Sequence, residues 1–129
     1  MNKNIVILLL IFIIPLFSYF MLSQNNKGNI SIAEANCPKL IKFTSDMCSE
    51  CKRVEPVVNS VMTKYQDNIQ YIVIPVQVRN KYNVDMMKKY NITLVPTIVI
   101  LDKNNKVVHR IEGYVAPNTL DNYLRNISK

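Results

Sequence analysis

Three features of the sequence predict an α/β fold, with a small central sheet that carries helices on both faces. A β-prone run at 39–44 is followed by a segment whose apolar residues recur at helical spacing. Further β-branched runs alternate with helical patterns along the chain. The last two strands flank a short polar turn, which is typical of an antiparallel hairpin. The predicted order is β-α-β-α-β-β-α, in which each β-α-β crossover returns right-handed over the sheet.

The first half of this order rests on two apolar patterns. The helix after the first strand has its apolar residues at i, i+3, i+4, i+7, i+8 and i+11, namely Val54, Val57, Val58, Val61, Met62 and Tyr65. The run QYIVIPVQV, at about 70–78, indicates a second buried strand, and its Pro75 predicts a strand end or a bulge. A short helix is expected at 83–90, with Asn83 as its N-cap.

The second half contains the hairpin and a final helix. Strands are predicted at 97–101 and 106–112, on either side of the turn DKNN. Asn118 is expected to cap the last helix, whose apolar face comprises Leu120, Tyr123, Leu124 and Ile127. At 129 residues the chain has room for one such domain.

The N-terminus is strongly apolar, with no charged residue from Ile5 to Leu22. A helix of that length reaches ~27 Å, close to the thickness of a hydrocarbon core, so residues 1–22 are predicted to be an uncleaved membrane anchor. A cleaved secretory signal is the alternative, but the A-x-A pattern at 33–35 lies far beyond the apolar run. Polar residues 23–36 predict a linker, and 37–129 the folded domain.

The charge pattern bears on orientation and partners. Lys3 and the terminal amine precede the apolar segment, which points to an N-in, C-out arrangement with an extracytoplasmic domain. The net charge of +7 is spread along the chain without long like-charge runs or a basic stripe interleaved with aromatics. Nucleic acid is therefore not expected as a partner. A mildly basic domain fits the surface of an anionic membrane.

Cys48 and Cys51 fall between the first strand and the first helix, at the carboxyl end of that strand, where ligands and chemistry gather in such sheets. Cysteines one helical turn apart have Cα atoms ~5–6 Å apart, which a disulfide accepts. At a helix start, free N–H groups and the macrodipole lower a thiol pKa from ~8.5 toward ~3.5–7.5. Cys48 is therefore the candidate nucleophile and Cys51 the candidate resolving thiol.

The cysteine pair has two other interpretations. The pair could be two buried structural thiols, or it could belong to a zinc site made of Cys37, Cys48, Cys51 and His109. Cys37 precedes the strand whose far end carries the pair, so it should lie ~20 Å away. Neither a metal nor a cofactor is expected. Met86, Met87 and the tyrosines at helical spacing indicate core or rim positions.

Several motifs together resemble the thioredoxin-fold oxidoreductases over residues 37–129. They are CSECK at a helix start, Pro56 inside that helix, Val95-Pro96-Thr97 before the hairpin, and Gly113 after it. The resemblance implies a thioredoxin-like three-layer α/β/α sandwich with a redox disulfide between Cys48 and Cys51. It also implies that Pro96 is cis and faces the cysteine pair.

The resemblance further implies a substrate-binding edge beside the cysteines. In this family the backbone at the position of Val95 pairs with the substrate as an added strand. Met47 stands where tryptophan is common, and it is a flexible apolar substitute at a peptide-facing surface. The substrate-binding residues expected here are therefore Met47, Val95 and Pro96.

Lys42 departs from the family pattern, because many members carry a buried acid six residues before the first cysteine. That acid usually relays the proton of the second thiol. Lys42 could replace it if burial frees its amine. The ordinary alternative is that the Lys42 stem packs in the core while its ammonium extends outward to water.

The residues between and after the cysteines bear on the direction of electron flow. Glu50 places an anion near the Cys48 thiolate, which argues for a weak oxidant or a reductant, and Lys52 and Arg53 partly offset it. The expected protein is a membrane-tethered thiol-disulfide oxidoreductase that acts on cysteines of extracytoplasmic proteins and is recharged by a membrane electron carrier. The alternative is a non-catalytic module that holds a peptide at the Pro96 edge.

Overall fold

The computed structural model describes residues 2–5, 7, 11–15 and 36–129. The predicted anchor (1–22) and linker (23–36) therefore lie largely outside the described residues and stay predictions. Within the described ranges, no helix is long and apolar enough to cross a membrane. Residues 3–5, 7 and 11–15 are helical, and they belong to a different unit from residues 36–129.

Four strands form one mixed sheet in the order β2-β1-β3-β4. They are β1 (Lys39–Thr44), β2 (Gln70–Pro75), β3 (Thr97–Leu101) and β4 (Val107–Glu112). β1 runs parallel to β2 and antiparallel to β3, and β3 and β4 form the predicted antiparallel hairpin. β2 ends at Pro75, which confirms the predicted strand end. Proline has no backbone N–H and therefore cannot donate a hydrogen bond to a neighbouring strand.

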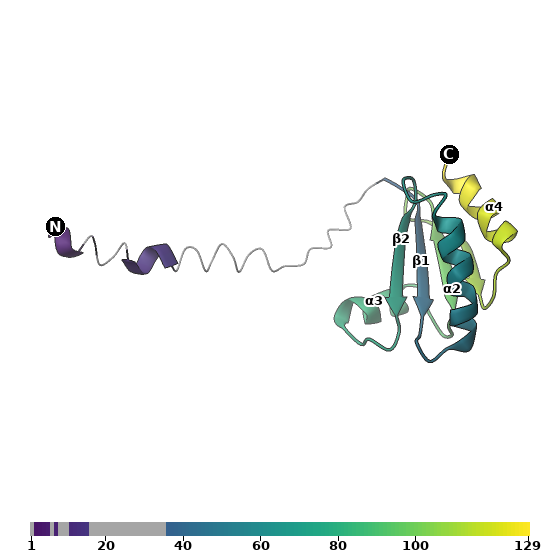
Figure 1. The fold of residues 1–129 in the computed structure, drawn as a ribbon, viewed down its shortest axis with the longest axis horizontal. Coiled ribbons are helices and arrows are strands. Elements are labelled where there is room, and N and C mark those ends of the chain that lie inside the picture. Colours follow the sequence, from purple (N-terminus) through teal and green to yellow (C-terminus); the bar gives the residue numbers. More distant parts are fainter. Residues whose placement is uncertain (1, 6, 8–10, 16–35) are drawn as a thin grey trace. The chain divides into compact units, whose positions relative to one another are not determined.

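Helices cover both faces of this sheet. α2 (Ser49–Met62) and α4 (Pro117–Ile127) pack on one face, and α3 (Lys81–Lys89) packs on the other (Figure 1). Alternation along β1 explains this arrangement, because Leu40 faces the α2 and α4 side while Ile41 and Phe43 face the α3 side. The element order and the three-layer α/β/α architecture both agree with the prediction.

α3 begins earlier than predicted. Its N-cap is Asn80, whose Oδ1 accepts a hydrogen bond of 2.8 Å from the Asn83 N–H. Asn83 lies inside the helix and is buried, and its Nδ2 donates to the carbonyl oxygens of Pro75 and Val78. The prediction of Asn83 as N-cap is wrong, because Asn80 caps the helix and Asn83 instead donates to two carbonyls at and just after the end of β2.

α4 also starts differently, although its apolar face was predicted correctly. Ala116 is the N-cap without a side-chain hydrogen bond, and Pro117 is the first helical residue. The prediction of Asn118 as the cap is wrong, because proline suits the first helical position, where its missing N–H costs nothing. Leu120 and Leu124 are fully buried, and Tyr123 and Ile127 pack against them.

Candidate active site

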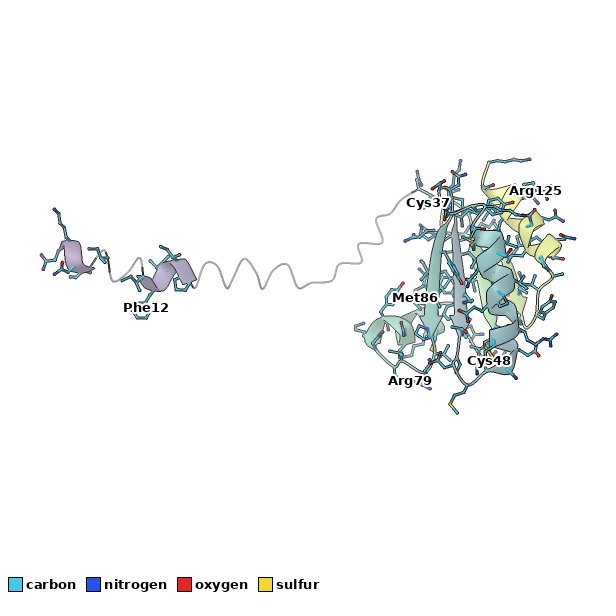
Figure 2. The ribbon with its side chains drawn as sticks, viewed as in Figure 1. Phe12, Cys37, Cys48, Arg79, Met86 and Arg125 are labelled. Atoms are coloured by element: carbon cyan, nitrogen blue, oxygen red, sulfur yellow. A yellow bond between two sulfur atoms is a disulfide. The ribbon has the colours of Figure 1, made fainter. Side chains whose placement is uncertain are left out.

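The turn between β1 and α2 places a sulfur atom at the start of a helix. Cys48 is the N-cap of α2, with extended backbone dihedrals (φ −101°, ψ 114°). Its Sγ accepts a hydrogen bond of 3.1 Å from the Cys51 N–H. The sulfur thus satisfies one of the N–H groups that every helix start leaves unpaired, a position where negative charge is favoured. Figure 2 labels Cys48 at this end of α2.

Cys48 and Cys51 form a disulfide, and their Cα atoms are 5.2 Å apart. The two sulfurs differ in exposure, because Cys48 is half-buried and Cys51 is only 3% exposed. An incoming thiolate or disulfide can therefore reach Cys48 more readily than the buried Cys51. The division into a nucleophile and a resolving thiol stays a prediction, and this asymmetry favours it.

The loop before β3 meets the cysteine pair. The Val95–Pro96 peptide bond is cis, as the resemblance implied, and the Val95 carbonyl oxygen lies 3.6 Å from Cys48 Sγ. Hydrogen bonds hold the loop on both sides. The Pro96 carbonyl accepts from the Gly113 N–H at 2.8 Å, and Thr97 Oγ1 donates to the Leu94 carbonyl at 2.8 Å. The disulfide has no S–H to donate, but a reduced Cys48 thiol could donate to Val95 O.

Exposed apolar side chains adjoin these two segments. Met47, next to Cys48, is 94% exposed, Leu94 is 45% exposed, and Tyr114, next to Gly113, is 50% exposed. A small cavity of about 120 Å³ adjoins Val95 and is lined by Val76, Met87, Ile92, Thr93 and Leu94. Apolar surface of this kind suits the binding of a polypeptide segment rather than a charged small molecule.

The charged groups just after Cys48 neutralise one another. Glu50 Oε1 accepts from Arg53 at 2.8 Å, and both side chains are exposed. Arg53 also lies over the ring of Tyr114, with its guanidinium carbon 5.5 Å from the ring centroid. The effect of the Glu50 anion on Cys48 is thus reduced by a cation one helical turn away and by water.

Lys42 is among the largest fully buried side chains of the described residues, with 2% of its surface exposed. Its Nζ lies 3.5 Å from Glu55 Oε1 and 5.8 Å from the centroid of the Tyr71 ring. The expectation that the stem packs is confirmed, but the expectation that the ammonium extends to water is wrong, because Glu55 reaches over to pair with it. Sequence analysis missed Glu55. Its position four residues after Cys51, on the same side of α2, was the available signal.

The remaining candidate residues lie apart from the cysteine pair. His109 stacks on Tyr123 with ring centroids 3.8 Å apart, which uses the imidazole for packing. Cys37 is a free thiol just before β1, whereas Cys48 follows the opposite end of that strand. In the parts of the chain that the structure describes, no three His, Cys, Asp or Glu side chains are grouped to hold a metal ion. The four candidate zinc ligands are not brought together.

A disulfide with one accessible sulfur, at a helix start and facing a cis-proline loop, defines the site of a thiol-disulfide oxidoreductase. Comparison with known proteins agrees. Residues 26–128 match the family described as thioredoxin-like domain. Thioredoxin 1 of Synechococcus elongatus is 30% identical over 93 residues, which cover 72% of this chain and 82% of that protein. Thioredoxin 1 of a Nostoc species is 28% identical over 93 residues, which again cover 72% of this chain and 82% of that protein.

A solved structure shows the same fold. It is thioredoxin-2, described as a component of malaria parasite protein secretion machinery, and it aligns with a TM-score of 0.62 at 18% identity. The alignment covers 70% of this chain and 82% of the thioredoxin-2 chain. The chain belongs to the thioredoxin-like family. With its Cys48–Cys51 disulfide, it is a thiol-disulfide oxidoreductase.

Proposed function

We propose that this protein is a membrane-tethered oxidoreductase that reduces disulfide bonds in extracytoplasmic proteins. The observation that carries the chemistry is the asymmetry of the pair, with an accessible N-cap sulfur at Cys48 and a buried partner at Cys51. The reduced protein holds Cys48 as a thiolate and Cys51 as a thiol. The helix N–H group that contacts Cys48 Sγ stabilises the anion.

The reaction takes two exchange steps. The Cys48 thiolate attacks one sulfur of a substrate disulfide, forms a mixed disulfide and releases the other substrate sulfur as a thiolate, which takes a proton from water. Cys51 then loses its proton to water, and its thiolate attacks Cys48 Sγ. The mixed disulfide breaks, the second substrate thiolate leaves, and the Cys48–Cys51 disulfide forms. Two electrons pass from the protein to the substrate.

The substrate is proposed to bind along the loop before β3. The Val95 backbone would pair with an extended segment of the substrate beside Cys48, because an unpaired backbone edge accepts an added strand, and Pro96 would contact that segment with its ring. Met47 would contact the same segment from the other side, and the small cavity next to Val95 would hold one apolar side chain of the substrate. These three residues supply binding, and the two cysteines supply chemistry.

The protein is further proposed to donate electrons to its substrates and to act outside the cytoplasm. Glu50 lowers the stability of a thiolate at Cys48, which favours a protein that acts as a reductant. The pairing of Glu50 with Arg53 makes this contribution small. Residues 1–22 would anchor the chain with its N-terminus in the cytoplasm and residues 37–129 outside. A membrane electron carrier would then return the disulfide to the dithiol.

Reduction of insulin by the full-length chain, with dithiothreitol as the electron source, tests the activity. We expect turnover by the wild type and none by Cys48→Ser. Cys51→Ser should stop at a mixed disulfide with the substrate, because the resolving thiol is missing. Cys37→Ser is the matched control and should turn over like the wild type. A wild type no faster than Cys48→Ser would favour the non-catalytic peptide-binding module instead.

A further inference from the structure

We propose that the buried ammonium of Lys42 stabilises the negative charge of the reduced cysteine pair, and that Glu55 limits this effect. Lys42 is then a positioning residue that sets the reduction potential of the disulfide and does not itself exchange protons or electrons. The inference rests on the proposed function, and it concerns a pair of side chains that the two exchange steps do not use.

The Lys42 side chain extends from β1 toward α2. Leu40 and Lys42 share one face of β1, and Leu40 packs with α2 residues Val54 and Val58. The Lys42 side chain therefore lies between β1 and α2, where only 2% of it is exposed. Its ammonium has one anionic partner among the described residues, Glu55, and otherwise faces the ring of Tyr71.

Cys51 lies on α2, the helix that also carries Glu55. Cys51 is 3% exposed, so it also lies on the buried side of α2. Glu55 is four residues further on, and side chains at that spacing have Cβ atoms about 5–6 Å apart. The carboxylate that holds the Lys42 ammonium thus belongs to the helical turn next to Cys51. Lys42 is the buried cation beneath this part of α2.

The two charges of the Lys42–Glu55 ion pair do not cancel at the cysteines. Glu55 is 58% exposed, so water and salt screen its field, whereas Lys42 acts through the protein interior. The nearby charges of Glu50 and Arg53 are exposed and paired with each other. Seen from the cysteine pair, the net field of Lys42 and Glu55 is therefore positive.

A positive field shifts a redox equilibrium only if the charge of the site changes in the reaction, and here it does. The disulfide is neutral. When two glutathione thiols reduce it, the Cys48–Cys51 bond breaks and the glutathione disulfide forms. The protein then carries a Cys48 thiolate and a Cys51 thiol, and one proton is released to water. Two electrons enter the protein, and one negative charge remains at the site, which the Lys42 ammonium stabilises.

The experiment measures the equilibrium constant for this reduction in glutathione buffers at pH 7, with the full-length chain in detergent. Lys42→Met keeps the volume of the side chain and removes its charge, and we expect the constant to fall about tenfold, equivalent to ~30 mV. Glu55→Gln removes the screened anion, and we expect a rise of about two- to threefold. Lys52→Met is the matched control, an exposed cation one residue after Cys51, and it should change the constant less than Lys42→Met.

The two variants are expected to shift the equilibrium constant in opposite directions. This separates an electrostatic role from a structural one, because a general loosening of the fold would shift the constant of both variants in the same direction. An unchanged or higher constant for Lys42→Met overturns the inference. If Lys42→Met fails to fold, Glu55→Gln decides alone, and an unchanged or lower constant overturns the inference. A wild type that does not exchange with glutathione at all contradicts the proposed function. If the wild type exchanges normally but both variants have the wild-type equilibrium constant, only the role of Lys42 is contradicted.

Discussion

The sulfur of Cys48 holds an N-cap position that serine, threonine, aspartate or asparagine oxygens usually occupy. This single placement gives the sulfur two properties at once, a hydrogen bond from the helix and access to the outside. Cys51, three residues later, has neither, because its own N–H is the donor and its side chain is buried. The different roles of the two cysteines thus follow from their positions in one helical turn.

Gly113 supports the site from the β4 side. Its φ of +84° lies in the left-handed region, and its N–H holds the Pro96 carbonyl. A Cβ built on Gly113 meets nothing within 4 Å. We therefore expect Gly113→Ala to lower the free energy of unfolding by about 1 kcal/mol through backbone strain alone. Unfolding in urea measures this difference in the free energy of unfolding between the variant and the wild type.

Gly113→Asn is the matched control for that prediction. Asparagine tolerates positive φ better than alanine, so this variant should lose less stability. Equal losses in the two variants would mean that steric crowding, and not backbone conformation, is the reason for glycine at this position.

At the scale of the element, α4 is joined to the turn that follows α2 by a polar cluster around Asp121. The carboxylate accepts hydrogen bonds from Lys64 at 3.1 Å, Tyr65 at 3.1 Å and Arg125 at 2.9 Å. These bonds, led by that from Lys64, hold the pKa of Asp121 below its ordinary value. A lowered folded-state pKa means that the carboxylate stabilises the fold above the unfolded-state pKa of about 4, and that this contribution is lost as the pH falls further.

Asp121→Asn tests this pH dependence. The variant should unfold at a lower urea concentration than the wild type at pH 7, and the difference should shrink below pH 4 as the wild-type carboxylate takes up its proton. Asp67→Asn, at an exposed aspartate in the turn after α2, is the control and should match the wild type throughout. A difference for Asp121→Asn that persists undiminished at pH 3 would contradict this account.

Sequence patterns predicted the elements better than their ends. The apolar stripe of α2 and the β-branched runs were strong signals because they are set by burial in the core. The caps were weak signals, because Asn80 and Asn83 have the same capping chemistry and only the folded position of Asn83, next to the Pro75 and Val78 carbonyls, decides between them. The partner of Lys42 was likewise hidden, because an ion pair between β1 and α2 depends on how the helix packs on the sheet.

At the scale of the whole molecule, the domain at 36–129 holds both sides of the site, since the β1–α2 turn and the β3 loop meet although about fifty residues separate them in sequence. The proposed anchor is a separate part of the chain. Its function would be to keep the reactive sulfur close to a membrane electron carrier.

The anchor predicts how the full-length chain behaves in cells. Expressed in bacteria, it should sediment with membranes and remain there after extraction with alkaline carbonate, because an apolar segment of this length is not released by high pH. A variant lacking residues 1–22 should appear in the soluble fraction. Release of the full-length chain by carbonate would contradict the anchor, and detection of a shortened chain would favour a cleaved signal.

The account depends most on the negative charge of the Cys48 sulfur in the reduced protein. The direct measurement is the rate of alkylation of Cys48 by iodoacetamide from pH 4 to pH 10 in reduced Cys37→Ser protein, with the labelled position identified by mass spectrometry. A thiol at a helix start should react with a midpoint well below the ordinary cysteine pKa of about 8.5. A midpoint at about 8.5 would show that the start of α2 does not activate Cys48.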